Sequence, residues 1–439
     1  MNVMNIYSIN QSLLNGRLDT PGLFPKIEQL KSSPVVFTQE FGLKTIPREP
    51  GIIIIRGARQ LGKSTWLEQK LYETILQEGP GSAFYLNGDE INDHQELFES
   101  ILNLSTQFNL KAKIKRIFID EITAIKNWEK SLKRLADQGI INEILIITTG
   151  SKTIDLRRGT ERLPGRKGKL DRTNFRFTPI SFLEFKKKAA KYFPGEKLIW
   201  AYVLTGGSPV AINELIREGK IPEYVIELTR DWVFGETSLQ GRSIESMKRV
   251  LFNLIEYGGL PVSLHTIAEQ AALANNTVAQ GYIDVLKDLG CLSSVMRLEA
   301  NKLKPIARKA SKHHFTYLLV VTSFFKNRMR TIEDFEKVPL DLKGKWIEWL
   351  VAQELWRRAA LAGADTPEQQ SFWKNDEHEV DFVFEDRFIE VKLNLAQPSD
   401  FAWFPKVFPK RKLEVICNSN FDVGFCSSIS LKKFLLQTP

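Results

Sequence analysis

The chain has 439 residues, 43% of them hydrophobic and 26% charged, which is ordinary for a globular protein and suggests about two to four domains. Lysine and arginine total 61 against 52 acidic residues, giving a net charge of +9 that suits a nucleic-acid partner and equally a solvated surface. The three cysteines lie far apart or lack CxxC spacing, which argues against a zinc site or a disulfide framework and fits a reducing cytoplasm.

No membrane segment is expected. The first residues, MNVMNIYSIN, lack the charged and apolar regions of a signal peptide. The longest apolar run, FTYLLVVTSFF at 315–325, is too short to span a bilayer. We predict a core strand at this run and a cytoplasmic protein.

A glycine-rich turn follows the first strongly apolar stretch. Residues 57–64 read GARQLGKS and fit the phosphate-binding pattern GxxxxGK[ST] without a gap. The apolar run at 52–55 is typical of a buried parallel strand, and residues 65–77 have apolar positions at helical spacing. Strand, turn and helix therefore come in the order that a nucleotide site requires. The expected nucleotide-binding residues are Gly57, Ala58, Arg59, Gln60, Leu61, Gly62, Lys63, Ser64 and Thr65.

The chemistry of phosphate binding explains these residue types. Glycines let backbone N–H groups turn inward around phosphates without Cβ clashes, and the helix N-terminus adds partial positive charge. Lys63 can reach the β- and γ-phosphates of ATP, and Ser64 can bind Mg²⁺ through its hydroxyl.

A second apolar strand should end in an aspartate that completes such a site. Residues 115–122 read KRIFIDEI, which puts Asp120 at the carboxyl end of a strand, where ligands bind in open α/β sheets. We predict that Asp120 binds Mg²⁺, directly or through water. Glu121 would orient or deprotonate the attacking water.

A third strand, expected over 143–149, also ends in polar residues. Thr148, Thr149 and Ser151 are candidates to hydrogen-bond the γ-phosphate or the water, and Thr149 represents them in the predicted site.

A strongly basic segment, 152–191, comes next, and Pro164, Gly165 and Gly168 predict a flexible loop within it. Three interpretations are open. The segment could supply an arginine finger to the nucleotide of a neighbouring subunit, contact a phosphate backbone, or be a solvated loop.

Several pieces of the sequence, in their order, resemble the prokaryotic AAA-like predicted ATPases whose C-terminal part is restriction-endonuclease-like. The pieces are RGARQLGKST, RIFIDEI, TTGS followed by LPGR, PISFLEF and YVLTGGSP, and the resemblance covers residues 50–395. It implies an ATP-binding core. It also makes Arg166, in LPGR, the candidate finger, which would act in trans in a homo-oligomer.

The middle of the chain is expected to be helical. Residues 206–209 (GGSP) form a sharp turn between helices, and the resemblance places 191–240 as a helical bundle behind the nucleotide. Helices are expected over 244–256, 266–273 and 277–289, then a strand over 291–298. That order is typical of a winged helix-turn-helix, in which Asn276, Thr277 and Gln280 would start the DNA-recognition helix. The alternative is a contact between domains.

The second half carries a spacing typical of nucleases. Residues 374–392 read KNDEHEVDFVFEDRFIEVK and predict two strands joined by a tight turn. Asp381, Glu390 and Lys392 then have the D-x8-E-x-K arrangement of the PD-(D/E)xK nucleases, with Glu390 and Lys392 on one face. In such a site Asp381 and Glu390 bind a divalent metal, and Lys392 stabilises the nucleophile or the developing charge.

A helix expected over 346–358 offers a third carboxylate for this metal, Glu348, with Glu354 as the alternative. The chain departs from the family pattern at 309–321, where we expect a strand ending in Asp and Gly but read Leu-Leu-Val-Val. The alternative to a nuclease site is a fold remnant that binds DNA or another protein.

Together these features predict an α/β protein. Its parts are a P-loop (AAA-like) parallel-sheet core, a helical lid, a winged helix-turn-helix and a restriction-endonuclease-like α/β domain. The expected bounds are 1–50 for an N-terminal extension, 51–190 for the ATPase core, 191–240 for the lid, 241–305 for the winged helix and 306–439 for the last domain. We expect Mg²⁺-dependent ATP hydrolysis coupled to movement of the C-terminal domains. The alternatives are a nucleotide-gated DNA-binding regulator with little hydrolysis and an ATP-regulated metal-dependent DNA nuclease.

Overall fold

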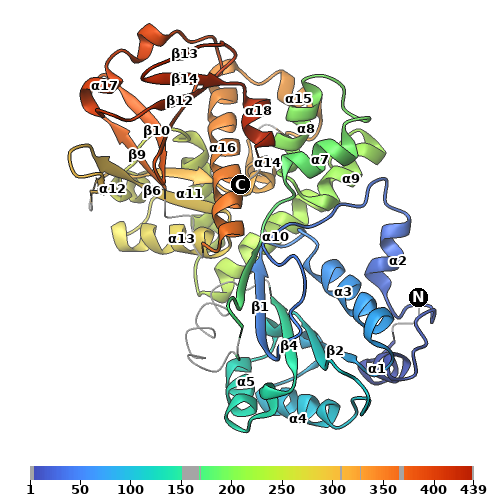
Figure 1. Ribbon diagram of the computed structural model, residues 1–439. Helices are drawn as coiled ribbons and strands as arrows, with labels where there is room; N and C mark the ends of the chain where they lie inside the picture. The colour runs from blue at the N-terminus through green and yellow to red at the C-terminus, as the bar shows by residue number, and fades with distance from the viewer. Residues whose placement is uncertain are drawn as a thin grey trace. The chain divides into compact units, whose positions relative to one another are not determined.

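The computed structural model describes residues 4–150, 168, 170–306, 309–326, 328–364 and 370–437. The chain divides into two compact units, Met1–Thr178 and Pro179–Pro439 (Figure 1). The first unit thus ends before residue 190, the expected end of the ATPase core. The five segments expected from the sequence are finer than these two units and stay predictions. Within the described ranges no helix is both long and apolar enough to cross a membrane.

The first unit is built on five parallel strands in the order β2-β3-β4-β1-β5. Their bounds are β1 Gly51–Gly57, β2 Ala83–Asn87, β3 Arg116–Asp120, β4 Leu145–Gly150 and β5 Asn174–Phe177. Every residue of β1 is buried, as expected for a parallel strand that is covered on both faces. This confirms the three strands predicted around the phosphate-binding residues.

Helices cover this sheet on both faces (Figure 1). Ile52 and Ile54 share one core with α4 (His94–Ser105) and α5 (Trp128–Asp137). Because side chains alternate along a strand, Ile53 and Ile55 point to the opposite face. There α3 (Lys63–Glu78) packs against β2, β3 and β4.

The N-terminal segment belongs to this unit. It forms α1 (Ile6–Leu14), which packs against β2, and α2 (Pro25–Lys31), which packs against α3. The Asn10 amide pairs with the backbone of Tyr85 through two hydrogen bonds of 2.8 Å. These bonds satisfy peptide groups of β2, which is an edge strand of the sheet.

The second unit contains a mixed sheet in the order β13-β14-β12-β11-β10-β9-β6-β7, with β8 paired to β6. The strands are β6 Leu292–Glu299, β7 Lys304–Pro305, β8 Lys312–Phe315, β9 Gln370–Lys374, β10 Glu379–Phe384, β11 Arg387–Val391, β12 Leu413–Ile416, β13 Asp422–Val423 and β14 Cys426–Ile429. β10 is antiparallel to β9 and β11, whereas β11, β12 and β14 run parallel. The predicted hairpin of β10 and β11 is confirmed, with Glu385 at a φ of 54° in its turn.

The helices of the second unit are α7 Phe182–Ala189, α8 Lys197–Thr205, α9 Pro209–Glu218, α10 Glu223–Leu239, α11 Ile244–Glu256, α12 Leu264–Gln270, α13 Asn276–Asp288, α14 Leu318–Phe324, α15 Ile332–Glu336, α16 Leu340–Ala362, α17 Phe404–Val407 and α18 Leu431–Leu436. The predicted helix 244–256 matches α11, and the expected turn lies between α8 and α9. The predicted helix 266–273 is shifted, since α12 begins and ends earlier.

The core strand predicted over 315–325 is wrong. Of the predicted run, only its first residue, Phe315, lies in a strand, where it is the last residue of β8. The helix α14 follows, and every residue of this helix is buried. A run that is apolar on all sides has no periodicity that separates a buried helix from a buried strand. The hydroxyls of Thr322 and Ser323 donate to carbonyls four residues back, at 3.3 and 2.7 Å, so these buried polar groups have hydrogen-bond partners within the helix.

Candidate functional site

The phosphate-binding loop of the first unit joins β1 to α3. Gly62 is the N-cap of α3 and has a φ of 97°, a left-handed conformation that favours glycine. A Cβ at Gly57 would lie 2.3 Å from the carbonyl oxygen of Phe177 in β5, so only glycine fits there. From the N-terminal segment, Gln39 donates from Nε2 to the Leu61 carbonyl over 2.8 Å. These contacts hold the loop at the N-terminus of α3, where anions bind favourably.

Lys63 is buried inside this loop. Its Nζ donates to the carbonyl oxygens of Gly57 and Ala58, both at 2.9 Å. Burial lowers the pKa of Lys63, while Glu121 and Asp120 act in the opposite direction. Both hydrogen-bond partners are neutral, and an ammonium group forms stronger, charge-assisted bonds with phosphate oxygens. The ammonium is therefore able to exchange these carbonyls for a nucleotide.

The carboxyl ends of β3 and β4 lie beside each other and carry the predicted acidic pair. The Thr149 hydroxyl donates to Oδ1 of Asp120. The Glu121 amide donates to the same oxygen at 3.1 Å and to the Thr149 hydroxyl at 3.2 Å. Glu121 has a left-handed φ of 45°, and its Oε1 accepts a bond of 2.9 Å from Thr123. The three predicted residues therefore form one hydrogen-bonded group.

The three candidates for the polar residue at the end of β4 differ in their contacts. Thr149 bonds to Asp120, whereas the Thr148 hydroxyl donates to the Ile53 carbonyl inside the sheet at 3.3 Å. Ser151 lies outside the described residues. The contacts therefore favour Thr149.

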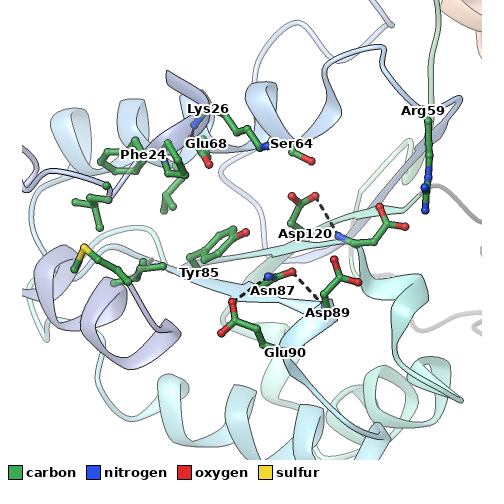
Figure 2. A pocket seen from close by; sticks show the side chains of 17 residues that line it. Phe24, Lys26, Arg59, Ser64, Glu68, Tyr85, Asn87, Asp89, Glu90 and Asp120 are labelled. Atoms are coloured by element: carbon green, nitrogen blue, oxygen red, sulfur yellow. Dashed lines mark hydrogen bonds between the residues drawn. The ribbon is translucent and has the colours of Figure 1, made fainter. Parts of the chain in front are cut away.

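A cavity of about 520 Å³ opens between the loop and the strand ends. Figure 2 shows Ser64 and Arg59 on its loop side, with Asp120 opposite. Phe24 and Tyr85 line another part of the cavity. The loop and the acidic pair therefore share one hollow, and the N-terminal segment supplies part of its wall.

Glu68 also lines this cavity and was not predicted from the sequence. It lies one turn after Ser64 on α3, and its Oε2 accepts hydrogen bonds from the amides of Lys26 at 2.8 Å and Ile27 at 3.2 Å. Burial raises the pKa of Glu68 to about 7, against the effect of these two bonds. The only signal in the sequence is its i+4 spacing from Ser64, which puts both on one helix face.

The side chains of this cavity fit Mg²⁺ bound together with a nucleotide. In the part of the chain that the structure describes, no group of three or more His, Cys, Asp or Glu could hold a metal ion. Mg²⁺ at nucleotide sites keeps several waters and takes one or two protein ligands beside phosphate oxygens. Ser64 and Asp120, which line the same cavity, meet that requirement.

The second unit brings together the predicted nuclease residues. Asp381 on β10 and Glu390 on β11 are both buried, and the Asp381 amide donates to Oε2 of Glu390 at 3.2 Å. Lys392 pairs with Oε1 of Glu390 at 2.6 Å. Burial raises the pKa of Glu390 to about 8, with Asp381 acting in the same direction. Glu348 of α16 joins this group through Lys312, which bonds to both Glu348 and Asp381.

Other predicted residues lie elsewhere or are not described. Glu354, the alternative third carboxylate, pairs with Arg357 and Arg358 at 2.8 and 2.7 Å instead. Arg166, the candidate finger, lies outside the described residues. Sequence reasoning missed Lys312 and its neighbours His314 and Glu379. In the sequence, Lys312 and His314 are marked only by their i, i+2 spacing, which puts both side chains on one face of a strand.

The fold and the loop together define the class of the first unit, a P-loop domain on a parallel α/β sheet. Residues 49–186 match the family described as an AAA domain. The winged helix and the endonuclease-like domain lie outside that match and stay predictions.

Two proteins of Methanocaldococcus jannaschii are similar in sequence. The uncharacterized protein MJ1544 is 24% identical over 403 residues, covering 86% of this chain and 82% of that protein. The uncharacterized protein MJ1637 is 30% identical over 113 residues, covering 25% of this chain and 23% of that protein. Among solved structures, the Walker-type ATPase PABY2304 of Pyrococcus abyssi is 14% identical, with a TM-score of 0.42, and covers 68% of this chain and 93% of that chain. The activity of this chain has to be argued from its own residues.

Proposed function

We propose that the first unit binds ATP with Mg²⁺ and hydrolyses it. One observation carries this proposal: Ser64 at the start of α3 and the pair Asp120 and Glu121 at the end of β3 line a single cavity. Lys63, next to Ser64 in the chain, donates its hydrogen bonds within the described residues to two neutral carbonyl groups. The acidic pair and the start of α3 in one cavity, with the Lys63 ammonium beside them, suit a triphosphate and its metal ion.

Each residue has a definite role in this mechanism. Lys63 leaves the carbonyls of Gly57 and Ala58 and binds the β- and γ-phosphates, and Ser64 and Asp120 hold Mg²⁺. The bound Mg²⁺ neutralises negative charge on the phosphates. Glu121 orients the attacking water or accepts its proton, and the bond from Thr123 fixes the carboxylate for this task.

The test of this proposal separates binding from hydrolysis. In Glu121→Gln we expect ATP affinity to stay within about threefold while turnover falls by about 10²–10⁴, the usual size of a general-base effect. Calorimetry with a non-hydrolysable analogue measures binding, and phosphate release measures turnover. Glu99→Gln, on the exposed face of α4, is the matched control and should leave both unchanged. Full turnover in Glu121→Gln would contradict the assigned role.

The finger and the oligomer stay proposals that rest on the resemblance. Arg166 would contact the nucleotide of a neighbouring copy and stabilise the charge of the transition state. Mixing Arg166→Ala with an excess of Glu121→Gln protein tests this arrangement. If the finger acts in trans, mixed assemblies gain turnover that neither variant has alone.

We also propose that the second unit contacts DNA, through the start of α13. The order α11, α12, α13, β6 is that of a winged helix. Asn276 and Thr277 are exposed there, and the Asn275 side chain caps the helix at 3.0 Å from the Val278 amide. The Gln280 amide donates to Asp284 at 2.8 Å, so it is less available than the other two.

An electrophoretic shift assay tests the DNA proposal and its nucleotide-gated form together. Affinity should fall steeply with salt, and Asn276→Ala/Thr277→Ala should weaken it at every salt concentration. If ATP analogues change the DNA affinity measured in this assay, the result supports a nucleotide-gated DNA-binding regulator. If they leave the affinity unchanged, ATP does not control DNA binding. The nuclease alternative requires a metal ion between Asp381 and Glu390, and the contacts of Lys312 argue against it.

A further inference from the structure

A buried lysine lies at the centre of the carboxylates of the second unit. The Lys312 side chain, on β8, is 1% exposed. Its Nζ lies 3.0 Å from Glu348 Oε1 and 2.9 Å from Asp381 Oδ1, and it also bonds to Glu379. One ammonium therefore has partners on α16 and on both ends of the Glu379–Asp381 stretch of β10. A divalent ion in a PD-(D/E)xK site needs the same kind of position, between carboxylates of the helix and the hairpin.

The oxygens that a metal would need already accept hydrogen bonds from the protein. Glu348 Oε1 accepts from Lys312 and contacts His314 Nε2 at 2.9 Å. Asp381 accepts from Lys312 on Oδ1 and from the Val391 amide, at 2.9 Å, on Oδ2. Two of the three residues that the nuclease interpretation assigned to metal, Glu348 and Asp381, thus already have partners within the chain.

The charge state of Lys312 fits its partners. Three carboxylates surround the Nζ of Lys312, and these contacts favour the charged ammonium over the neutral amine. An ammonium that stays charged repels a divalent ion strongly at contact distance in a buried site.

We propose that the Lys312 ammonium is the resident cation of this cluster, and that Glu348, Glu379 and Asp381 hold it in place of a divalent metal ion. The residues therefore do not fit the metal that the nuclease resemblance implies. Lys312 ties β8, β10 and α16 together as an internal counterion. Removing it should convert a closed ion cluster into an open carboxylate site for a divalent cation.

Metal titration of the full chain tests this proposal directly. All proteins carry Asp120→Asn, so that the first unit contributes no Mn²⁺ ligand from β3, and no nucleotide is added. Electron paramagnetic resonance of free Mn²⁺ counts the bound ions. The Asp120→Asn protein should bind no Mn²⁺ in the second unit. Adding Lys312→Ala should create one site per chain, and adding Asp381→Asn to that variant should remove it.

Two outcomes of the titration would overturn the proposal. The first is a Mn²⁺ site in the Asp120→Asn protein that Asp381→Asn abolishes, because Lys312 would then coexist with the metal. The second is a folded Lys312→Ala variant that binds no Mn²⁺, because the ammonium would then not be what fills the position.

A second measurement keeps the test decisive if Lys312→Ala does not fold. Fe²⁺ with ascorbate and peroxide cleaves a backbone near a bound iron ion, and it can be applied to the unmodified protein. We expect no cuts in β10 or β11. Cleavage there that excess Mg²⁺ suppresses would show a working metal site beside Lys312 and overturn the proposal.

Discussion

Two buried lysines, one in each unit, have opposite kinds of hydrogen-bond partner. Lys63 in the first unit donates to the neutral carbonyls of Gly57 and Ala58, and burial lowers its pKa. Lys312 in the second unit bonds to carboxylates, and its pKa is raised. With the proposed nucleotide bound, the Lys63 ammonium would exchange neutral carbonyls for phosphate oxygens, whereas the Lys312 ammonium would lose buried ion pairs by moving away. The partners of a buried charge therefore indicate whether it is available to a ligand.

Removing the cation from the ion cluster should give the largest change. In Lys312→Met we expect the free energy of unfolding to fall by about 3–5 kcal/mol, because buried carboxylates lose their counterion. Urea unfolding of the full chain, followed by tryptophan fluorescence, measures the loss. Lys302→Met removes an exposed pair with Glu299, 3.0 Å apart, and serves as the control. It should cost less than about 1 kcal/mol. Equal small losses in both variants would contradict the difference drawn between the lysines.

Removing the other buried lysine should affect binding rather than folding. In Lys63→Ala we expect ATP-analogue affinity to fall by about 100-fold, the size of losing charge-assisted bonds worth about 2.7 kcal/mol. The free energy of unfolding should stay within about 1 kcal/mol, because the hydrogen bonds that Lys63 forms among the described residues go to neutral carbonyls. Calorimetry and urea unfolding measure the two effects. Lys70→Ala, on the same helix and paired with Glu73, should change neither. If Lys63→Ala unfolded, Lys63 would stabilise the fold as Lys312 does, and the contrast between the two lysines would be wrong.

The same comparison of hydrogen-bond partners applies to a buried carboxylic acid of the first unit, Glu68. Glu68 has neutral amides as its hydrogen-bond partners, and burial raises its pKa from 4.5 to about 7. A raised pKa in the folded state means that its contribution to stability is complete below pH 4.5 and is lost as pH rises through 7.

The loss should be about 2 kcal/mol, less than the full shift implies because the site is partly solvated. In Glu68→Gln the stability curve should be flatter than that of the unmodified protein between these pH values. Urea unfolding across the pH series measures the difference. Glu73→Gln, half-exposed on the same helix, should keep the original slope. An unchanged slope in Glu68→Gln would mean that the two amides keep this carboxylate ionised.

The predictions that succeeded from sequence depend on residues close together in the chain. The strand, loop and helix around 57–64 are one continuous segment, and the strand ending at Asp120 is another, so the sequence of each predicts its elements by itself. The hairpin of β10 and β11 is likewise local, with its turn at Glu385. For such segments the periodicity of apolar residues and the turn chemistry are sufficient.

The predictions that failed, or were never made, depend on contacts between distant residues. Lys312 meets Glu348 and Asp381, which are 36 and 69 positions away, and no local pattern marks such a meeting. The place of Glu68 beside Lys26 is equally non-local, at a separation of 42. The helix α14 was mistaken for a strand because packing on all sides removes the periodicity that distinguishes the two.

Two adjacent threonines offer the finest test of the site in the first unit, and sequence alone left them equivalent. Thr149 bonds to Asp120, whereas Thr148 bonds to the Ile53 carbonyl. In Thr149→Val we expect turnover to fall about fivefold, because one hydrogen bond of about 1 kcal/mol no longer positions Asp120. Thr148→Val is its control and should stay within about twofold of the unmodified protein, as measured by phosphate release at saturating ATP. A larger loss in Thr148→Val would mean that β4 supports the site through its packing and not through the side chain that meets Asp120.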